Sequence, residues 1–174
     1  MVQCWLRSYR RGYAPDALSS ILEYLVLPFL GFVILYLLVL LSVYRAVVRP
    51  PRVREGWALG RGLPLDPDHL GVPWSEVEGL DSAWILEGSG TTNWLLLHGH
   101  GRSRRVWMHV LPELLPHAGS VVVVDFPGHG DANGEVQLGR CEHEALASWL
   151  ESSRARWCVA GMSMGAGVAL RLAA

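Results

Sequence analysis

Hydrophobic and polar positions divide the chain into one long uncharged stretch and a later series of short apolar runs. The stretch from Tyr24 to Tyr44, YLVLPFLGFVILYLLVLLSVY, carries no charged residue. At a helical rise of 1.5 Å per residue it would be about 31 Å long, the thickness of the hydrocarbon core of a bilayer. The pattern predicts a single transmembrane helix within residues 21–48, preceded by a short arm of residues 1–20.

A cleavable signal peptide is the main alternative for this stretch. It would need a shorter apolar core and a small-residue cleavage site, whereas RAVVRPPRVRE follows here. The sequence therefore favours an uncleaved membrane anchor. Arginines flank the stretch on both sides: Arg7, Arg10 and Arg11 before it, and Arg45, Arg49, Arg52 and Arg54 after it. Because the two sides carry similar numbers of arginines, the positive-inside rule favours a cytoplasmic C-terminal domain only slightly, and the orientation stays open.

Beyond a linker at residues 49–69, rich in Pro, Gly and charge, the apolar runs alternate between strand and helix patterns. The predicted strands are SAWILEG, NWLLLHG, SVVVVDFPG and WCVAG. The predicted helices are RVWMHVLPELLPHAG, interrupted by Pro112, then CEHEALASWLESSR, and MGAGVALRLAA. The four consecutive valines predict a strand buried on both faces. This order predicts an α/β domain with a mostly parallel sheet and helices on both faces.

Three polar clusters each follow a predicted strand directly. They are HGHGRS, DFPGHGDANG and GMSMG. Ligands of parallel sheets gather at the carboxyl ends of the strands, so we expect these clusters to meet along one edge of the sheet.

The third cluster contains Gly161-Met162-Ser163-Met164-Gly165, which fits the pattern Gly-x-Ser-x-Gly. In one large enzyme class this pattern places a nucleophilic serine on a sharp strand-to-helix turn. A predicted strand precedes it here and small residues follow, as such a turn requires. The alternative is a small-residue turn with a hydrogen-bonded serine. The context favours Ser163 as a catalytic nucleophile.

The first cluster, His98-Gly99-His100-Gly101, suits the other requirement of acyl transfer, two backbone N–H groups aimed at the developing oxyanion. One would be the N–H of Met164, next to the serine, and the other the backbone N–H of His100, where glycines allow close approach. The two histidines could instead bind a metal. No further ligand falls at zinc spacing nearby, so we expect no metal. Acyl transfer by an activated serine requires no cofactor, so we expect none.

Composition narrows the classes of function. The apolar content of 51% is high for a soluble domain and agrees with a membrane segment. A net charge of −1, without a basic cluster, argues against a nucleic-acid surface. Cys4, Cys141 and Cys158 are too scattered to indicate disulfides or a zinc site, and Cys158 is predicted to be buried in its strand.

In this order, NWLLLHGHGRSRRVW, VVVVDFPGHGDANG and WCVAGMSMGAGVALRLA resemble the amino-terminal half of an α/β-hydrolase-fold serine hydrolase. They are similar to its membrane-anchored, Bem46-like branch of serine aminopeptidase and lipase type, found in bacterial inner or plasma membranes. The resemblance covers about Leu70 to Ala174, with DHLGVPWSEVEGLDSAWILEG as the first hairpin. It implies Ser163 as nucleophile, the amides of His100 and Met164 as oxyanion hole, and a small-molecule or lipid ester or amide as substrate.

The sequence departs from this family at its end. The family's triad runs Ser, then acid, then His along the chain, and neither an acid nor a histidine follows Ser163. Asp125 and His129 are expected to shape a loop, and neither His129 nor His143 is expected to act as base. We therefore expect a C-terminally incomplete hydrolase, inactive as these 174 residues. The alternative is a non-catalytic membrane protein or interaction module that keeps half of the fold. Substrate and oligomeric state stay open.

Overall fold

The computed structural model describes residues 20–52, 55–62 and 64–174. The predicted N-terminal arm therefore lies, apart from its last residue, outside the described residues. The chain divides into two compact units after Tyr44. Each unit is described by itself.

The first unit contains most of the apolar helix, which extends four residues past Tyr44. A π-helical turn, η1 (Leu22–Val26), leads into α3 (Leu27–Val48). Pro28 has no backbone N–H to donate and its ring crowds the carbonyl one turn earlier, which accounts for the wider turn at η1. The helical stretch Leu22–Val48 has 27 residues and none of its apolar span is buried. By length and composition it could cross a membrane.

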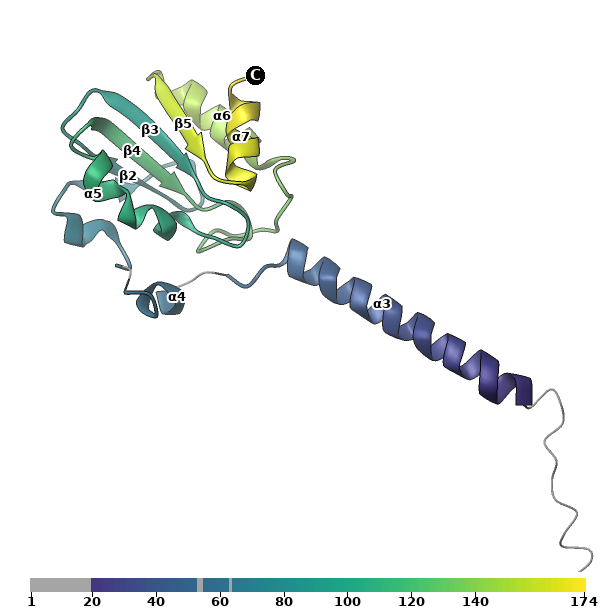
Figure 1. Cartoon of the computed structure of the whole chain (residues 1–174). Coiled ribbons are helices and arrows are strands. Elements are labelled where there is room, and N and C mark those ends of the chain that lie inside the picture. The colour runs from purple at the N-terminus through teal and green to yellow at the C-terminus, as the bar shows by residue number, and fades with distance from the viewer. Residues whose placement is uncertain (1–19, 53–54, 63) are drawn as a thin grey trace, which may run out of the picture. The chain divides into compact units, whose positions relative to one another are not determined.

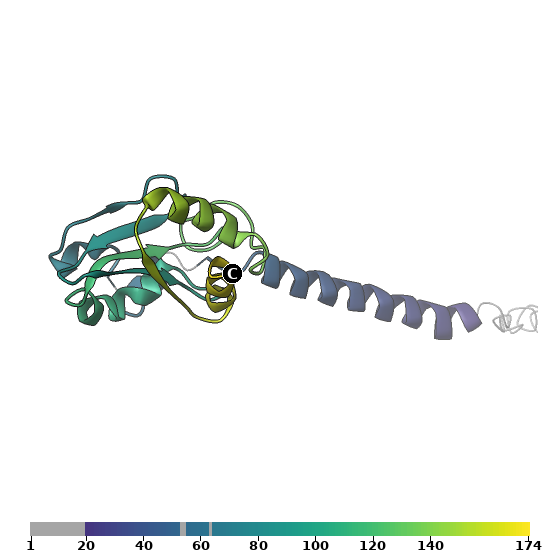
Figure 2. The same cartoon turned by 90° about the horizontal axis from the view of Figure 1, so that it is seen from above.

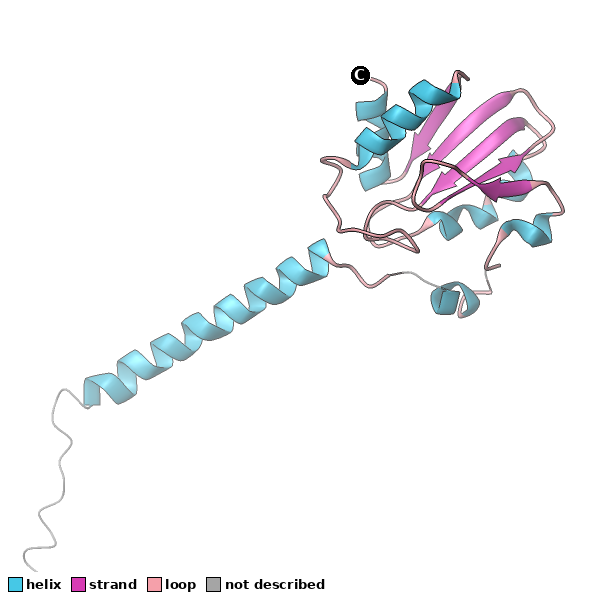
Figure 3. Cartoon of the chain, turned by 180° about the vertical axis from the view of Figure 1, so that it is seen from behind, coloured by secondary structure: helices cyan, strands magenta, loops and turns pink. Residues whose placement is uncertain are grey.

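The second unit is built on a five-stranded mixed sheet in the order β1-β2-β4-β3-β5 (Figure 1). The strands are β1 (Trp74–Glu76), β2 (Ala83–Glu87), β3 (Thr92–Leu97), β4 (Ala118–Val124) and β5 (Trp157–Gly161). β3 runs parallel to both β4 and β5, whereas β2 is antiparallel to β1 and β4. Figure 3 shows the strands side by side from behind. The polar segments after β3, β4 and β5 therefore share one edge of the sheet, as predicted.

Helices cover both faces of this sheet (Figure 2). One face packs against the 3-10 helix η3 (Arg104–His109) and α5 (Leu111–Leu114), and the other against α6 (Glu142–Ser153) and α7 (Met164–Leu172). The valines of β4 explain why one strand serves both layers. Val121 and Val123 join the first core, and Val122 and Val124 the second. Successive side chains of a strand point to opposite faces, so a run of four apolar residues is buried on both.

Two segments differ from the sequence prediction. The helix expected from RVWMHVLPELLPHAG is divided at Val110 into η3 and α5, because Pro112 lacks a backbone N–H and restricts the residue before it. The segment at residues 49–69 contains α4 (Glu55–Leu59) and the 3-10 helix η2 (Pro67–Leu70). Ala58 of α4 is fully buried in the first core, so this segment packs on the domain.

The prediction that Cys158 is buried is wrong, because its side chain is exposed. β5 is the outermost strand of the described sheet, paired with β3 alone. Trp157 and Val159 face α6 and α7, and strand alternation therefore turns Cys158 to the opposite face. The helices of that face do not bury it.

Candidate active site

Ser163 lies on the tight turn between β5 and α7. It has φ +52° and ψ −115°, a backbone conformation that residues other than glycine rarely adopt. Its side chain is exposed, and no described residue forms a hydrogen bond with its hydroxyl. The turn therefore presents a strained serine with a hydroxyl accessible to other molecules.

The two glycines around Ser163 are required by close backbone approach. A Cβ atom on Gly165 would lie 2.4 Å from the carbonyl oxygen of Leu97 and 2.6 Å from that of His98. On Gly161 a Cβ would lie 2.4 Å from the carbonyl carbon and oxygen of Gly165. All of these distances are shorter than real Cβ contacts, so the start of α7 packs directly on the end of β3 and on β5.

The loop after β3 lies against this turn. The N–H of Met162 donates to the carbonyl oxygen of Leu97 at 3.0 Å. A Cβ on Gly99 would be 3.3 Å from the carbonyl oxygen of Met162 and 3.3 Å from the Cβ of Ser163. The structure thus brings together the first and third polar clusters, with glycine backbone beside the serine.

His98 fastens this loop to the end of β4. Its side chain is fully buried, its Nε2 accepts the N–H of Phe126 at 3.1 Å, and its Nδ1 donates to the carbonyl oxygen of Gly99 at 2.8 Å. Since Nε2 is an acceptor, the proton sits on Nδ1 and the ring is neutral. Burial lowers the pKa of His98 to about 3. This residue is a structural donor and acceptor.

The rings of His98 and His100 both lie near the ring of His129, with centroids 5.1 and 5.4 Å from it. His129 is buried, its Nδ1 donates to the carbonyl oxygen of Pro127 at 3.1 Å, and its Nε2 has no partner among the described residues. Burial lowers the pKa of His129. His143 lies on α6. No described histidine hydrogen-bonds Ser163, and no described group of side chains suits a metal ion.

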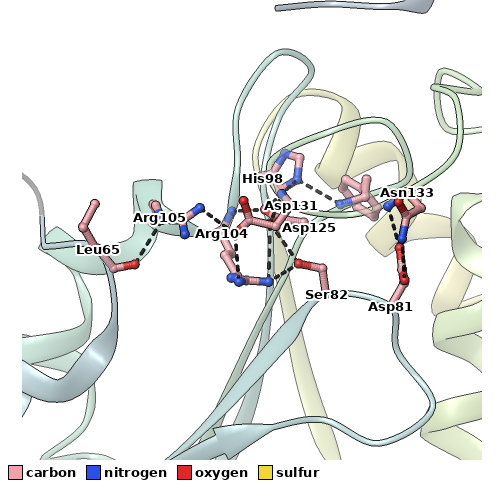
Figure 4. Close-up of polar contacts among 10 residues, drawn as sticks. Leu65, Asp81, Ser82, His98, Arg104, Arg105, Asp125, Asp131 and Asn133 are labelled. Carbon is pink, nitrogen blue, oxygen red and sulfur yellow. Dashed lines mark hydrogen bonds and ion pairs between the residues drawn. The ribbon is translucent and has the colours of Figure 1, made fainter. Parts of the chain in front are cut away.

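Behind the loop lies a buried cluster of charged side chains (Figure 4). The carboxylate of Asp125, directly after β4, faces the guanidinium of Arg104, with Nη1 and Oδ2 3.5 Å apart. Burial raises the pKa of Asp125 and lowers the pKa of Arg104, since each ion is removed from water. The charge of each partner opposes the shift of the other's pKa. Asp125 thus has the structural place expected for it, although its arginine partner was not predicted.

The backbone amides of His100 and Met164, the predicted oxyanion donors, have no hydrogen-bond acceptor among the described residues. The first N–H groups of a helix have no acceptor within the helix, and Met164 is the first residue of α7. Sequence reasoning missed Ser82, Arg104 and Asp131, which surround Asp125. The only sequence signal was the pair Arg104-Arg105 directly after the glycine loop, and two adjacent arginines are equally typical of an exposed surface.

Residues 94–174 match the model of the alpha/beta hydrolase family. This match, the sheet order and the similarity to a solved esterase structure agree on an α/β-hydrolase fold, which confirms the predicted fold class. Among solved structures, an esterase of Pyrococcus furiosus is similar, with a TM-score of 0.58 and 28% identity. The similarity covers 71% of this chain and 52% of that esterase.

Curated relatives agree with this class. The chain is 34% identical over 90 residues to a pimeloyl-[acyl-carrier protein] methyl ester esterase of Pectobacterium carotovorum. The match covers 52% of this chain and 34% of that esterase, so the chain spans about a third of its length. A second relative is the dihydrolipoyllysine-residue acetyltransferase component of the acetoin cleaving system of Pseudomonas putida. It is 33% identical over 105 residues, which is 57% of this chain and 28% of that protein.

The packing at Gly165 predicts a large loss of stability in Gly165→Ala. The added methyl group would overlap the carbonyls of Leu97 and His98, and forcing backbone apart costs about 1–3 kcal/mol or more. Gly167→Ala, two residues further along α7, is the matched control. Nothing lies within 4 Å of a Cβ there, so alanine should stabilise α7 by about 0.5–1 kcal/mol. Urea unfolding followed by tryptophan fluorescence measures both; equal effects would contradict the packing.

The neutral, buried His98 predicts that stability falls as the solution is acidified. Its pKa is about 3 in the folded domain and 6.5 when unfolded, so below pH 6.5 the unfolded state binds a proton that the folded state does not. Between pH 7 and 5.5 the free energy of unfolding should fall by about 1 kcal/mol from this residue, with His129 adding in the same direction.

Urea unfolding at several pH values checks this expectation. His98→Gln should be less stable throughout but less sensitive to pH, whereas His117→Gln, at an exposed turn, should keep the wild-type dependence. A wild-type stability that stays constant from pH 7 to 5.5 would contradict this expectation, because the folded domain would then take up protons as readily as the unfolded chain.

Proposed function

We propose that the protein is a serine hydrolase of the esterase type, with Ser163 as its nucleophile. The observation that carries the proposal is the conformation of Ser163, held at positive φ between two glycines that tolerate no side chain. Strain of this kind is costly and is found where function requires it. The exposed hydroxyl and the adjacent glycine loop support the same role.

The reaction follows from this arrangement. The Oγ of Ser163 attacks the carbonyl carbon of an ester while its proton passes to a general base. The amides of His100 and Met164 donate hydrogen bonds to the oxyanion of the tetrahedral intermediate. The intermediate collapses with loss of the alcohol, which takes up the proton from the base. Water then attacks the acyl-enzyme, and the acid product leaves with Ser163 restored.

The general base is proposed to be a histidine outside these 174 residues. In this fold the acid and histidine follow the serine along the chain. His98 is unsuited to the role because both of its ring nitrogens are engaged and its pKa is about 3. His129 is nearly inaccessible to solvent and donates to its own loop. Measurements of activity therefore require the full-length protein produced from its native gene.

A carboxylic ester is the proposed substrate class, because the Pectobacterium relative and the Pyrococcus structure are both named as esterases. We further propose that the helix Leu22–Val48 anchors the protein in a bacterial membrane as a single span, as in the membrane-anchored Bem46-like branch. Its length and lack of buried side chains support this placement. Tethering would keep the domain near esters that partition into the bilayer.

Labelling with a fluorophosphonate probe tests the nucleophile. The full-length protein should become covalently labelled, and Ser163→Ala should lose the label and at least a thousandfold of esterase activity, the order expected for a catalytic nucleophile. Ser152→Ala, at an exposed position of α6, is the matched control and should label like the wild type.

The same experiment separates the proposal from its alternative. Label that persists in Ser163→Ala would assign the reactivity to another residue. A wild-type protein that is folded but takes no label would favour the non-catalytic module with half of a hydrolase fold.

Membrane anchoring is tested by alkaline extraction of membranes. The wild-type protein should stay in the membrane pellet at its full mass. Leu35→Arg combined with Leu38→Arg should release it, since each arginine at the centre of a span costs about 2.5–3.5 kcal/mol. Recovery of a shortened, soluble protein from the wild-type gene would instead identify the helix as a cleaved signal peptide.

A further inference from the structure

The charged cluster behind the glycine loop is an unexpected feature of a domain core. The side chain of Asp125 is completely buried, and that of Arg104 is 5% exposed. Buried ion pairs add little net stability, because removing the ions from water offsets their attraction, and apolar residues often serve as well. A fixed arrangement of the surrounding backbone is the other benefit that such a cluster can provide.

Three separate segments meet at the carboxylate of Asp125. Its Oδ1 accepts the backbone N–H of Arg104 at 2.6 Å, and its Oδ2 accepts the backbone N–H of Asp131 at 3.0 Å and the hydroxyl of Ser82 at 3.2 Å. Figure 4 shows these side chains converging from different parts of the chain. The loop after β4 folds so closely around the carboxylate that a Cβ on Gly130 would lie 2.2 Å from Oδ2.

The guanidinium of Arg104 completes the cluster. It donates to the hydroxyl of Ser82 and, at 3.1 Å, to Asp131, and it lies 4.0 Å above the ring of Trp84. Asp131 also pairs with Arg105 at 2.9 Å. Two carboxylates are thus balanced by two guanidinium groups, and the segment after the glycine loop is held by both its main chain and its side chains.

These contacts anchor the loop of residues 98–103 at both ends. At its start, His98 accepts the N–H of Phe126, and at its end the N–H of Arg104 donates to Asp125. Both anchors therefore belong to the two residues that follow β4. Between them lie Gly99, in contact with the Ser163 turn, and the amide of His100.

We propose that Asp125 is a positioning residue for catalysis, whose buried carboxylate holds the loop of residues 98–103 so that the His100 amide faces the oxyanion formed at Ser163. The inference rests on the proposed function. Asp125 touches no substrate and acts through the backbone of Arg104. An amide that stabilises only the developing charge contributes to the transition state more than to substrate binding. Loss of its position should therefore lower kcat and leave KM nearly unchanged.

Asp125→Asn in the full-length protein is the principal test. The side chain keeps its size, but one carboxylate oxygen becomes an NH₂ donor that faces other donors, so at least one anchor is lost. With a p-nitrophenyl ester we expect kcat to fall about 10- to 100-fold, with KM within about threefold of the wild type. Asp68→Asn, at an exposed position whose amide oxygen can still accept from Trp74, is the matched control and should leave both constants unchanged.

Hydrogen exchange gives a readout that does not depend on activity. Peptides covering residues 98–104 should exchange at least tenfold faster in Asp125→Asn than in the wild type, while those covering β5 and α6 should not change. Should Asp125→Asn not fold, Ser82→Ala removes one acceptor and one donor from the cluster and should give the same pattern with a smaller, about 3- to 10-fold, loss of kcat.

A loss of kcat at constant KM, together with faster exchange of residues 98–104, supports the proposal. It is overturned if kcat is unchanged, if KM rises as much as kcat falls, or if exchange increases equally throughout the domain, as a general loss of stability would produce. A folded wild-type protein without fluorophosphonate labelling rejects the proposed function instead, whatever the exchange data show.

Discussion

The close approach of two backbones at Gly165 is the constraint on which the candidate site depends. The first turn of α7 lies directly on the carbonyls of Leu97 and His98 at the end of β3, with no room for a side chain between them. This contact leaves Ser163 at positive φ and brings Gly99 against its Cβ. The serine turn and the glycine loop are therefore parts of one rigid junction between neighbouring parallel strands.

The junction is supported from behind by polar groups, where most domains have apolar packing. Each charge in the cluster around Asp125 has a partner of opposite sign, and the neutral His98 uses both ring nitrogens. Without partners these groups would be costly to bury. With their partners they hold the loops after β3 and β4 in a single well-defined position. The cluster and the sheet thus fix the same loop from two directions.

Local patterns in the sequence were sufficient to predict most of the strands and helices of the fold. The valines of β4 and the helical spacing of α6 and α7 depend on neighbours a few residues away, so they were predictable, and the fold class is confirmed. The position of β2 beside β4 could not be predicted from such patterns. It depends on contacts of Gly88 and Gly90 with Ala118 and His117, which are distant in the sequence. The exposure of Cys158 depends likewise on which strand lies outermost.

The candidate site shows the same division. Ser163, His100 and Met164 were chosen from short motifs, and their catalytic roles stay predictions. Arg104 and Arg105 could not be placed, because arginines are normally exposed and their partners at Ser82, Asp125 and Asp131 lie 20 or more residues away. The need for glycine at position 165 is likewise explained only by the structure, which shows the carbonyl groups that lie against it.

The same junction limits how the site can diversify. Gly161 and Gly165 cannot gain a side chain without displacing main chain, so most substitutions at these two positions should prevent folding. Met162, by contrast, lies between these two glycines in the sequence and is 44% exposed. The side chain next to the serine in the sequence can therefore vary in shape and polarity while the main chain of the junction stays in place.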